Sequence, residues 1–360
     1  MIRIYAACSP GEHRAAAVQD GALLDVAIGR PGRPDGMGDV HRGRVIARVP
    51  AMAGAFVALP DAEGFLPDSE GADGLSDGMA VTVRVTRAAQ GGKGPRLTAR
   101  LPQAAEPVRG PGAIERLAAL HPDAPIVVDD PAVVAALRPA LGDRMAVGTV
   151  PAEVLHAIDA LAEPGIALPG GMAATIHPTP ALVAIDVDSG AASAARQAKR
   201  TAQMAANMAM LPALTRQIRL RNLSGAIVVD VAGLSVRHRP ALAPAFAAAL
   251  ASDPLRPRFL GFSALGLAEI MRPRAHPPLH ELLAGPHAAG LSALRDIMLA
   301  AAAEPAVAFR LRAAPDVAAA LADDPVALPD LARRTGRALM VRSDPALPPG
   351  STAIERLPRA

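Results

Sequence analysis

The chain is poor in aromatic side chains. It contains no Trp, one Tyr and six Phe among its 360 residues, so aromatic residues make up 2% of the sequence. Hydrophobic residues nevertheless reach 51%, and the cores must therefore be built from Ala, Val, Leu and Ile. A chain of this length is expected to divide its buried surface among several domains.

Cysteine is nearly absent as well. Cys8 is the single one, which excludes an intramolecular disulfide and a zinc site built from several thiolates. No apolar run reaches the roughly 18 residues that a membrane span needs, and the first residues lack the apolar region of a signal peptide. These absences predict a soluble, cytoplasmic protein with no membrane span and no structural zinc.

Lysine is the third scarce residue. It occurs only at Lys93 and Lys199, so nearly all of the 37 basic residues are Arg, and the pI is near 9.7 although the net charge is only +3. Arg can bind a phosphate group through two donors at once. Composition by itself leaves nucleic-acid binding as one alternative among several.

Turn residues and hydrophobic periodicity divide the chain into segments. Residues 1–30 alternate as short strands do, with a turn at Asp20-Gly21. Residues 38–100 contain about five short strand-like runs, which predicts a small Greek-key barrel such as an OB-fold. Beyond a Pro/Gly-rich linker at 102–112, helix and strand patterns alternate. This alternation predicts α/β layers followed by a small α+β domain at the C-terminal end.

Three carboxylates stand at the ends of two apolar runs. Asp186 and Asp188 end the run "PALVAIDVDSG", and Asp230 ends the run "GAIVVDVAG". Residues two apart on a strand point to the same face, about 6 to 7 Å from each other. If the two strands are neighbours, the three side chains form an acidic cluster of the kind that binds Mg²⁺. The alternative is that they only end strands at the solvent edge.

Basic side chains lie on both sides of Asp230 in the sequence. The segment "TRQIRLRN" contains Arg216, Arg219 and Arg221, and "VRHRP" contributes Arg237, His238 and Arg239. Because Arg216 and Arg219 share a helix face, we expect them to point toward the end of the sheet that carries the carboxylates. A phosphodiester substrate would fit between such groups, although solvated helix faces have the same composition.

The barrel segment contains two of the six Phe and one of the two Lys. Phe56, Phe65 and Lys93 lie in "GAFVAL", "EGFLP" and "GGKGPR". Aromatic rings on the outside of a barrel stack on unpaired bases, and a lysine in a Gly-rich loop can approach phosphate. The alternatives are two core phenylalanines and a solvated loop lysine.

Taken together, these motifs resemble the ribonuclease E/G family of bacterial endoribonucleases. The resemblance rests on "ALVAIDVDSG", "TRQIRLRNLSGAIVVDV", "VRHR" and "GFSALGLAEIMRPR", the last being most similar to the ribonuclease G branch. The barrel segments "GRVIARVPAMAGAFVALPDAEGFLP" and "GKGPRLTARL" resemble the family's S1 domain, and "RSDPALPPG" resembles its small C-terminal domain. The likeness covers nearly the whole chain in the family's order.

The resemblance implies a fold of the mixed α/β, multidomain class. An RNase H-like subdomain would combine 1–36 with 113–175 and hold an inserted S1 RNA-binding domain at 37–101. A DNase I-like catalytic subdomain would span 176–285, and a small α+β domain 287–360.

The resemblance also implies an active site. Asp186 and Asp230 fall on the family's Mg²⁺-binding aspartates, where Mn²⁺ could substitute, and Asp188 would assist them. The family cleaves single-stranded RNA and leaves 5′-phosphate and 3′-hydroxyl ends. Phe56, Phe65 and Lys93 fall on the RNA-binding surface of its S1 domain.

Several positions depart from the family's pattern. Asp188 stands where the family usually has Asn, and Gly233 and Ala209 stand where it often has acidic residues. The segment that would form the 5′-end sensor is too short here. The Cys pair of the family's zinc link is absent, so we expect no zinc-linked tetramer and leave a homodimer open.

Two functions follow as hypotheses. The first is a compact, Mg²⁺-dependent endoribonuclease that binds single-stranded RNA on its barrel and cleaves it at Asp186, Asp188 and Asp230. The second is an RNA-binding paralogue that has lost turnover through its altered site.

Overall fold

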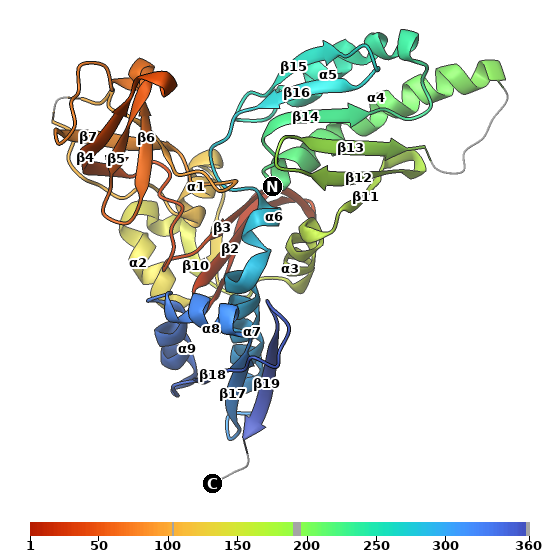
Figure 1. The fold of residues 1–360 in the computed structure, drawn as a ribbon. Helices are drawn as coiled ribbons and strands as arrows, with labels where there is room; N and C mark the ends of the chain where they lie inside the picture. Colours follow the sequence, from red (N-terminus) through yellow and green to blue (C-terminus); the bar gives the residue numbers. More distant parts are fainter. Residues whose placement is uncertain (103, 190–195, 358–360) are drawn as a thin grey trace. The chain divides into compact units, whose positions relative to one another are not determined.

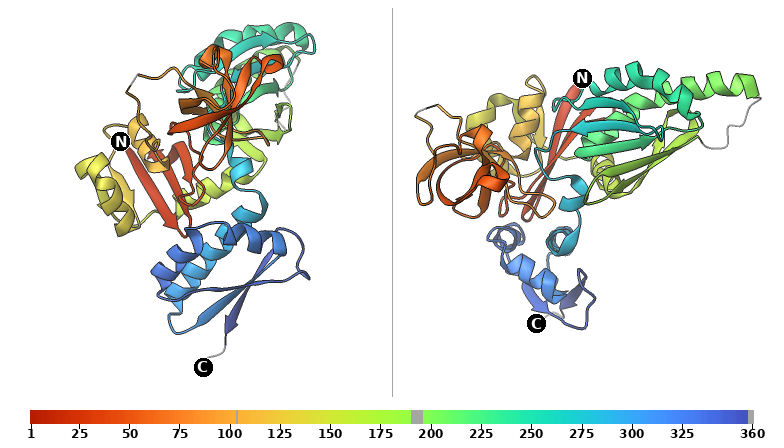
Figure 2. Two further views of the ribbon diagram at one scale, coloured as in Figure 1. Left: turned by 60° about the vertical axis from the view of Figure 1, so that its left-hand side comes forward. Right: turned by 45° about the horizontal axis from the view of Figure 1, so that its top comes forward.

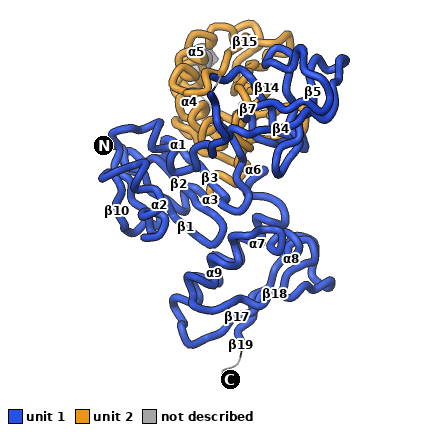
Figure 3. The backbone as a smooth tube through the Cα atoms, turned by 90° about the vertical axis from the view of Figure 1, so that its left-hand side faces the viewer, with its two compact units in different colours: residues 1–158, 280–360 blue, residues 159–279 orange. Residues whose placement is uncertain are grey.

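The computed structural model describes residues 1–102, 104–189 and 196–357. They form two compact units, one made of 1–158 together with 280–360 and the other of 159–279 (Figure 3). The fold mixes helices with several sheets and one closed barrel (Figure 1), so the predicted α/β multidomain class with a β-barrel is confirmed. Among the described helices, none is long and apolar enough to cross a bilayer.

The first unit begins with a five-stranded mixed sheet in the order β10-β9-β1-β2-β3. Strands β1, β2 and β3 form an antiparallel meander. On the other side of β1, β9 and then β10 extend the sheet and run parallel to β1. Asp20 and Gly21 both have positive φ, 50° and 78°, as a two-residue hairpin turn requires, so the predicted turn is confirmed. The elements are β1 (Ile2–Ser9), β2 (Glu12–Gln19), β3 (Ala22–Gly29), α1 (Ala113–Leu120), β9 (Ile126–Val128), α2 (Pro131–Leu141), β10 (Met145–Val147) and α3 (Ala152–Asp159).

Five short strands close the barrel predicted for residues 38–100. Alternate residues such as Val57, Leu66 and Val83 point inward and are almost fully buried. Gly54 is required at its position, because a Cβ there would lie 2.4 Å from the ring of Phe65. The barrel order is β4-β5-β6-β8-β7, formed by β4 (Val40–Val49), β5 (Gly54–Ala58), β6 (Glu63–Pro67), β7 (Ala80–Arg87) and β8 (Arg96–Thr98).

The second unit is a six-stranded sheet in the order β11-β12-β13-β14-β16-β15. Only β13 and β14 run parallel, because α4 connects them as a crossover, and the other neighbours are antiparallel. The elements are β11 (Gly165–Leu168), β12 (Met172–Pro178), β13 (Val183–Asp188), α4 (Arg196–Leu220), β14 (Gly225–Asp230), α5 (Ala243–Leu250), β15 (Arg258–Phe262) and β16 (Ala268–Arg272).

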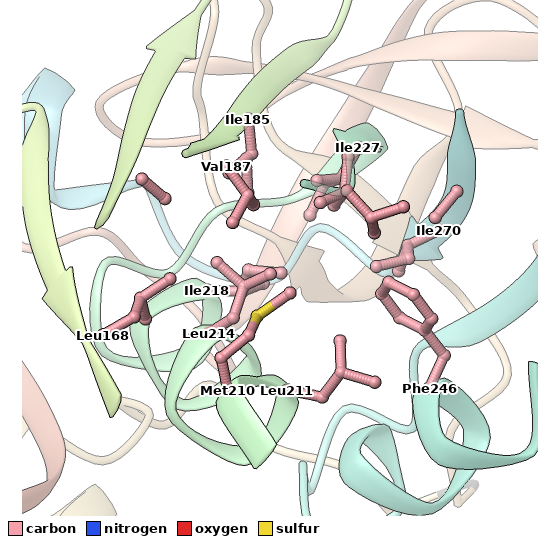
Figure 4. Close-up of a cluster of buried hydrophobic side chains, with 14 of the residues drawn as sticks. Leu168, Ile185, Val187, Met210, Leu211, Leu214, Ile218, Ile227, Phe246 and Ile270 are labelled. Carbon is pink, nitrogen blue, oxygen red and sulfur yellow. The ribbon is translucent and has the colours of Figure 1, made fainter. Parts of the chain in front are cut away.

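One face of this sheet forms the largest core described. Helices α4 and α5 cover it with side chains such as Leu214 and Phe246, which pack on Ile185 and Ile227 (Figure 4). Each fully buried side chain of this size contributes roughly 1.5–3 kcal/mol of hydrophobic stabilisation. Alternation along β13 and β14 turns the remaining side chains, the aspartates included, to the other face.

The predicted division at 175/176 is wrong in this part of the chain. It would cut through β12 itself, between Thr175 and Ile176, although β12 pairs with β13 along six residues from Ala173 to Pro178. The reason is that hydrogen bonding to a neighbouring strand, which local patterns do not reveal, decides which sheet a strand joins. The compact unit accordingly begins at 159.

The C-terminal part of the first unit is a three-stranded sheet in the order β18-β17-β19, with helices packed against it (Figure 2). Leu294, Leu311 and Leu321 are fully buried between the layers. Its elements are α6 (Leu279–Leu282), α7 (Gly285–Ala303), β17 (Ala308–Ala313), α8 (Pro315–Ala322), α9 (Ala327–Thr335), β18 (Met340–Ser343) and β19 (Thr352–Leu357).

A buried carboxylate joins this C-terminal part to the first sheet. The side chain of Glu12 on β2 is 1% exposed and accepts hydrogen bonds from Arg14, Arg30 and Arg295. The three guanidinium groups hold the pKa of Glu12 below its usual range, although burial alone would raise it.

Candidate active site

Asp186 and Asp230 are direct neighbours across two parallel strands. Asp186 on β13 is the register partner of Asp230 on β14, and adjacent strands lie about 4.8 Å apart. The two carboxylates therefore leave the same edge of the sheet side by side. The expectation that the two acidic runs form neighbouring strands is confirmed.

Asp188 lies on the same face as Asp186, one alternation further along β13. Both side chains are exposed, whereas Val187 between them is buried. Their partners on β12 are small, with Thr175 beside Asp186 and Ala173 beside Asp188. The register partners of these two carboxylates on β12 are therefore small side chains.

Arg239 contacts Asp230 directly. Its Nη1 donates to Oδ1 of Asp230 at 2.6 Å and to the carbonyl of Gly266 at 2.9 Å, and its Nε donates to the carbonyl of Leu234 at 2.9 Å. The Arg239 side chain is 13% exposed and that of Asp230 50%. Residues 237–239 were expected as one basic segment, and the sequence offered no signal to distinguish Arg239 from its neighbours.

Arg237 and His238 belong to the same 3₁₀ segment as Arg239, Val236–Leu242, which follows β14. Arg237 is exposed, and His238 shares a hydrogen bond of 2.8 Å between its Nδ1 and Oγ of Ser235. Their predicted contact with RNA stays a prediction.

Arg216 and Arg219 do not flank the carboxylates, and that prediction is wrong. Mid-helix Asn207 donates to the carbonyl of Ala232, next to the Asp230 end, whereas Arg219 donates to the carbonyl of Ser252. At 1.5 Å per residue, the twelve residues from Asn207 to Arg219 span about 18 Å of helix. The crossover must return to the start of β14 before Asp230, so its last turns lie at the opposite end of the sheet.

Arg221 is a structural residue, which contradicts its predicted place on an RNA-binding surface. It is 5% exposed, and its Nη1 donates to the carbonyls of Leu161 and Glu163 at 2.6 and 2.5 Å. Burial lowers the pKa of its guanidinium. The side chain ties the start of this unit to the turn between α4 and β14.

On the barrel, the two phenylalanines lie outside the core. Phe56 and Phe65 are register partners on β5 and β6, half-buried, with ring centroids 5.5 Å apart in an edge-to-face arrangement. Arg96 on β8 is the register partner of Phe65 and is exposed. Lys93 is exposed in the hairpin between β7 and β8, where its backbone pairs with that of Gln90.

The donors at the sheet edge suit a hydrated magnesium ion. Among the described residues, no three His, Cys, Asp or Glu side chains lie close enough to hold a metal ion by themselves. Mg²⁺ commonly takes one or two carboxylates and keeps several waters. Asp186 and Asp230 provide two such carboxylates. The thiol of Cys8 is not a candidate ligand here, because Cys8 is buried in the core of the other unit.

Open α/β sheets bind their ligands at the carboxyl ends of parallel strands, and Asp186, Asp230 and Arg239 lie at such an end. Residues 150–275 match the model of the Ribonuclease E/G family. This match contains Asp186, Asp188, Asp230 and Arg239.

Three curated proteins are similar in sequence to part of this chain. Ribonuclease E of Nostoc sp. is 36% identical over 121 residues, which cover 33% of this chain and 18% of that protein. Ribonuclease E of Escherichia coli K12 is 35% identical over 117 residues, 32% of this chain and 11% of that protein. Ribonuclease G of the same strain is 31% identical over 132 residues, 36% of this chain and 27% of that protein.

The aligned part thus spans about a quarter or less of these relatives. Both branches match, and the predicted leaning toward ribonuclease G is only weakly supported.

Proposed function

We propose that this protein is an Mg²⁺-dependent endoribonuclease that cleaves single-stranded RNA at the edge formed by β13 and β14. The observation that carries the proposal is the register of Asp186 with Asp230, two carboxylates from different strands at one sheet edge. The match of residues 150–275 to the Ribonuclease E/G family supports it.

Asp186 and Asp230 would hold the ion, with Mn²⁺ as a substitute, and the exposed Asp188 would bind one of its waters. When bound, the ion supplies an activated water and stabilises charge on the phosphate. Arg237 and His238 would contact the RNA phosphates next to the scissile bond. We assign 5′-phosphate and 3′-hydroxyl products to this reaction.

The barrel would bind the RNA outside the cleavage site. Phe56 and Phe65 offer two adjacent rings for stacking of unpaired bases, with exposed Lys93 and Arg96 beside them for the phosphates. Sequence-tolerant binding to single strands follows, because every base has a face that can stack. We propose the subdomains that the resemblance implies, with one change. The second unit begins at residue 159 instead of 176.

The test is cleavage of a short, 3′-labelled, AU-rich RNA in Mg²⁺ and in EDTA. The Asp186→Asn, Asp230→Asn double variant should lose at least a thousandfold in rate while still binding the RNA. The Asp123→Asn, Asp143→Asn variant removes two exposed carboxylates of the first unit and is the matched control. A loss of only a few-fold in the first variant, or cleavage in EDTA, would refute the proposal.

Substrates with 5′-monophosphate and 5′-triphosphate ends should be cleaved at equal rates if no 5′-end sensor operates. Bound but uncleaved RNA under all conditions would instead favour the non-cleaving RNA-binding protein.

A further inference from the structure

We propose that Arg239 is a positioning residue that orients Asp230 and weakens divalent-cation binding at the candidate site. This inference rests on the proposed function. It concerns a residue that neither the carboxylate pattern nor the family match assigns.

Arg239 joins three segments around one carboxylate oxygen. Its guanidinium donates to Leu234 in the loop after β14, to Gly266 in the turn between β15 and β16, and to Oδ1 of Asp230. Because two of these contacts are to backbone carbonyls, the guanidinium plane is fixed independently of the carboxylate. Asp230 is therefore held with Oδ1 turned toward Arg239, which leaves Oδ2 to face a cation.

The surrounding chain makes room for this arrangement. Gly266 has φ of +84°, which favours glycine, and a Cβ there would lie 3.1 Å from Cδ of Arg239 and 3.3 Å from its Nη1. The amide of Gly266 also closes its turn by donating to the carbonyl of Ser263 at 2.8 Å. A larger residue would displace the guanidinium from Asp230.

The charge of Arg239 opposes that of an incoming cation. Asp186, Asp188 and Asp230 place three negative charges at the sheet edge, and Arg239 cancels one of them at hydrogen-bond distance. A divalent ion bound to Asp230 would lie within about 6 Å of the guanidinium, where like charges repel. Arg239 therefore lowers cation affinity while it fixes the geometry of the ligand.

Removal of Arg239 should thus have two opposite effects. Arg239→Gln loses the repulsion, so Mn²⁺ should bind roughly three- to tenfold more tightly. Cleavage at saturating Mg²⁺ should fall about ten- to a hundredfold, because the carboxylate is no longer held in one orientation. A purely structural role predicts weaker binding together with slower cleavage.

The experiment titrates Mn²⁺ alone into each folded variant, followed by electron paramagnetic resonance, with RNA cleavage as a second readout. Arg239→Lys keeps the charge but not the fork of donors, so Mn²⁺ affinity should stay within twofold while cleavage falls. Arg258→Gln removes an exposed Arg on β15 beyond the contacts of Arg239 and should change neither. Circular dichroism and thermal unfolding verify the fold of each variant.

Unchanged or weaker Mn²⁺ binding by a folded Arg239→Gln variant would overturn the inference. If that variant does not fold, Arg239→Lys decides: wild-type cleavage by it would overturn the inference, and slower cleavage at unchanged affinity would support it. Absence of Mn²⁺ binding by the wild type, or equal binding by the Asp186→Asn, Asp230→Asn variant, would refute the proposed function and this inference with it.

Discussion

Phe56 and Phe65 face each other across β5 and β6, with ring centroids 5.5 Å apart and planes at 64°. They do not enter the barrel core, where Val57 and Leu66 occupy the neighbouring inward positions. The pair places two adjacent aromatic faces on the outer surface, where unpaired bases can stack on them. The pair is therefore the best-defined surface of the barrel for testing RNA binding.

Replacing either ring by Ala should weaken binding of single-stranded RNA by about 5- to 150-fold, the equivalent of 1–3 kcal/mol per stacked base. The maximal cleavage rate should change little, since the rings lie outside the carboxylate edge. Fluorescence anisotropy with a labelled RNA measures the effect. Met79→Ala, at a 45% exposed apolar residue of the barrel, is the control. Equal binding by Phe56→Ala, Phe65→Ala and the control would contradict the prediction.

Arg221→Ala should destabilise the protein by about 1–3 kcal/mol, because it leaves the buried carbonyl of Leu161 and the carbonyl of Glu163 without their donor. Arg216→Ala, five residues earlier on an exposed face of α4, should change the free energy of unfolding by less than about 0.5 kcal/mol. Urea unfolding of both variants measures the difference. If Arg221→Ala kept full stability and instead lost RNA binding, the structural role of Arg221 would be wrong.

Glu12→Ala should cost about 3–5 kcal/mol, because it leaves Arg14, Arg30 and Arg295 buried without their common carboxylate. Glu304→Ala offers a matched surface pair with Arg356, whose side chains are 38% and 67% exposed, and should cost less than about 1 kcal/mol. Calorimetry of the two variants tests this contrast. Similar losses in both would show that the buried cluster contributes no more than a surface pair.

The first unit should lose stability as the pH falls below about 6.5. Burial lowers the pKa of His13 and His287 from the ordinary value of 6.5, although Asp324 opposes the shift at His287. Both imidazoles are therefore neutral in the folded chain at a pH where the unfolded chain already binds protons. Their contribution is fully present above pH 6.5 and is lost as the pH falls toward their folded pKa values.

Asp324 adds a second loss at lower pH. Burial alone would raise its pKa, but the amides of Val326 and Ala327 and the ring of His287 hold it below the ordinary value of 3.8. Its contribution is present above that value and is lost as the pH falls through its folded pKa. For the two histidines, urea midpoints measured from pH 7.5 to 5.0 should fall for the wild type and fall less for His287→Asn. The loss from Asp324 should appear only when the series is extended below pH 3.8. A midpoint independent of pH would contradict the assignment.

Local patterns in the sequence were sufficient for much of this architecture. Alternation of apolar and polar residues predicted the barrel strands, the turn at Asp20-Gly21, and the common face of Asp186 and Asp188. Each of these depends on neighbours a few residues away, so the chain's own chemistry determines it. The same patterns place the acidic residues at strand ends in any arrangement of the sheets.

Long-range packing decided the rest. Only the crossover of α4 brings Asp230 beside Asp186, and the same crossover carries Arg216 and Arg219 to the far end of the sheet. The carbonyls of Leu234 and of Gly266, in the turn between β15 and β16, together hold Arg239 on Asp230. The sequence by itself determined which side chains could act at this edge, because strand periodicity is local. Which of them meet depends on strand order and helix direction, which are set by hydrogen bonds and core contacts between distant segments.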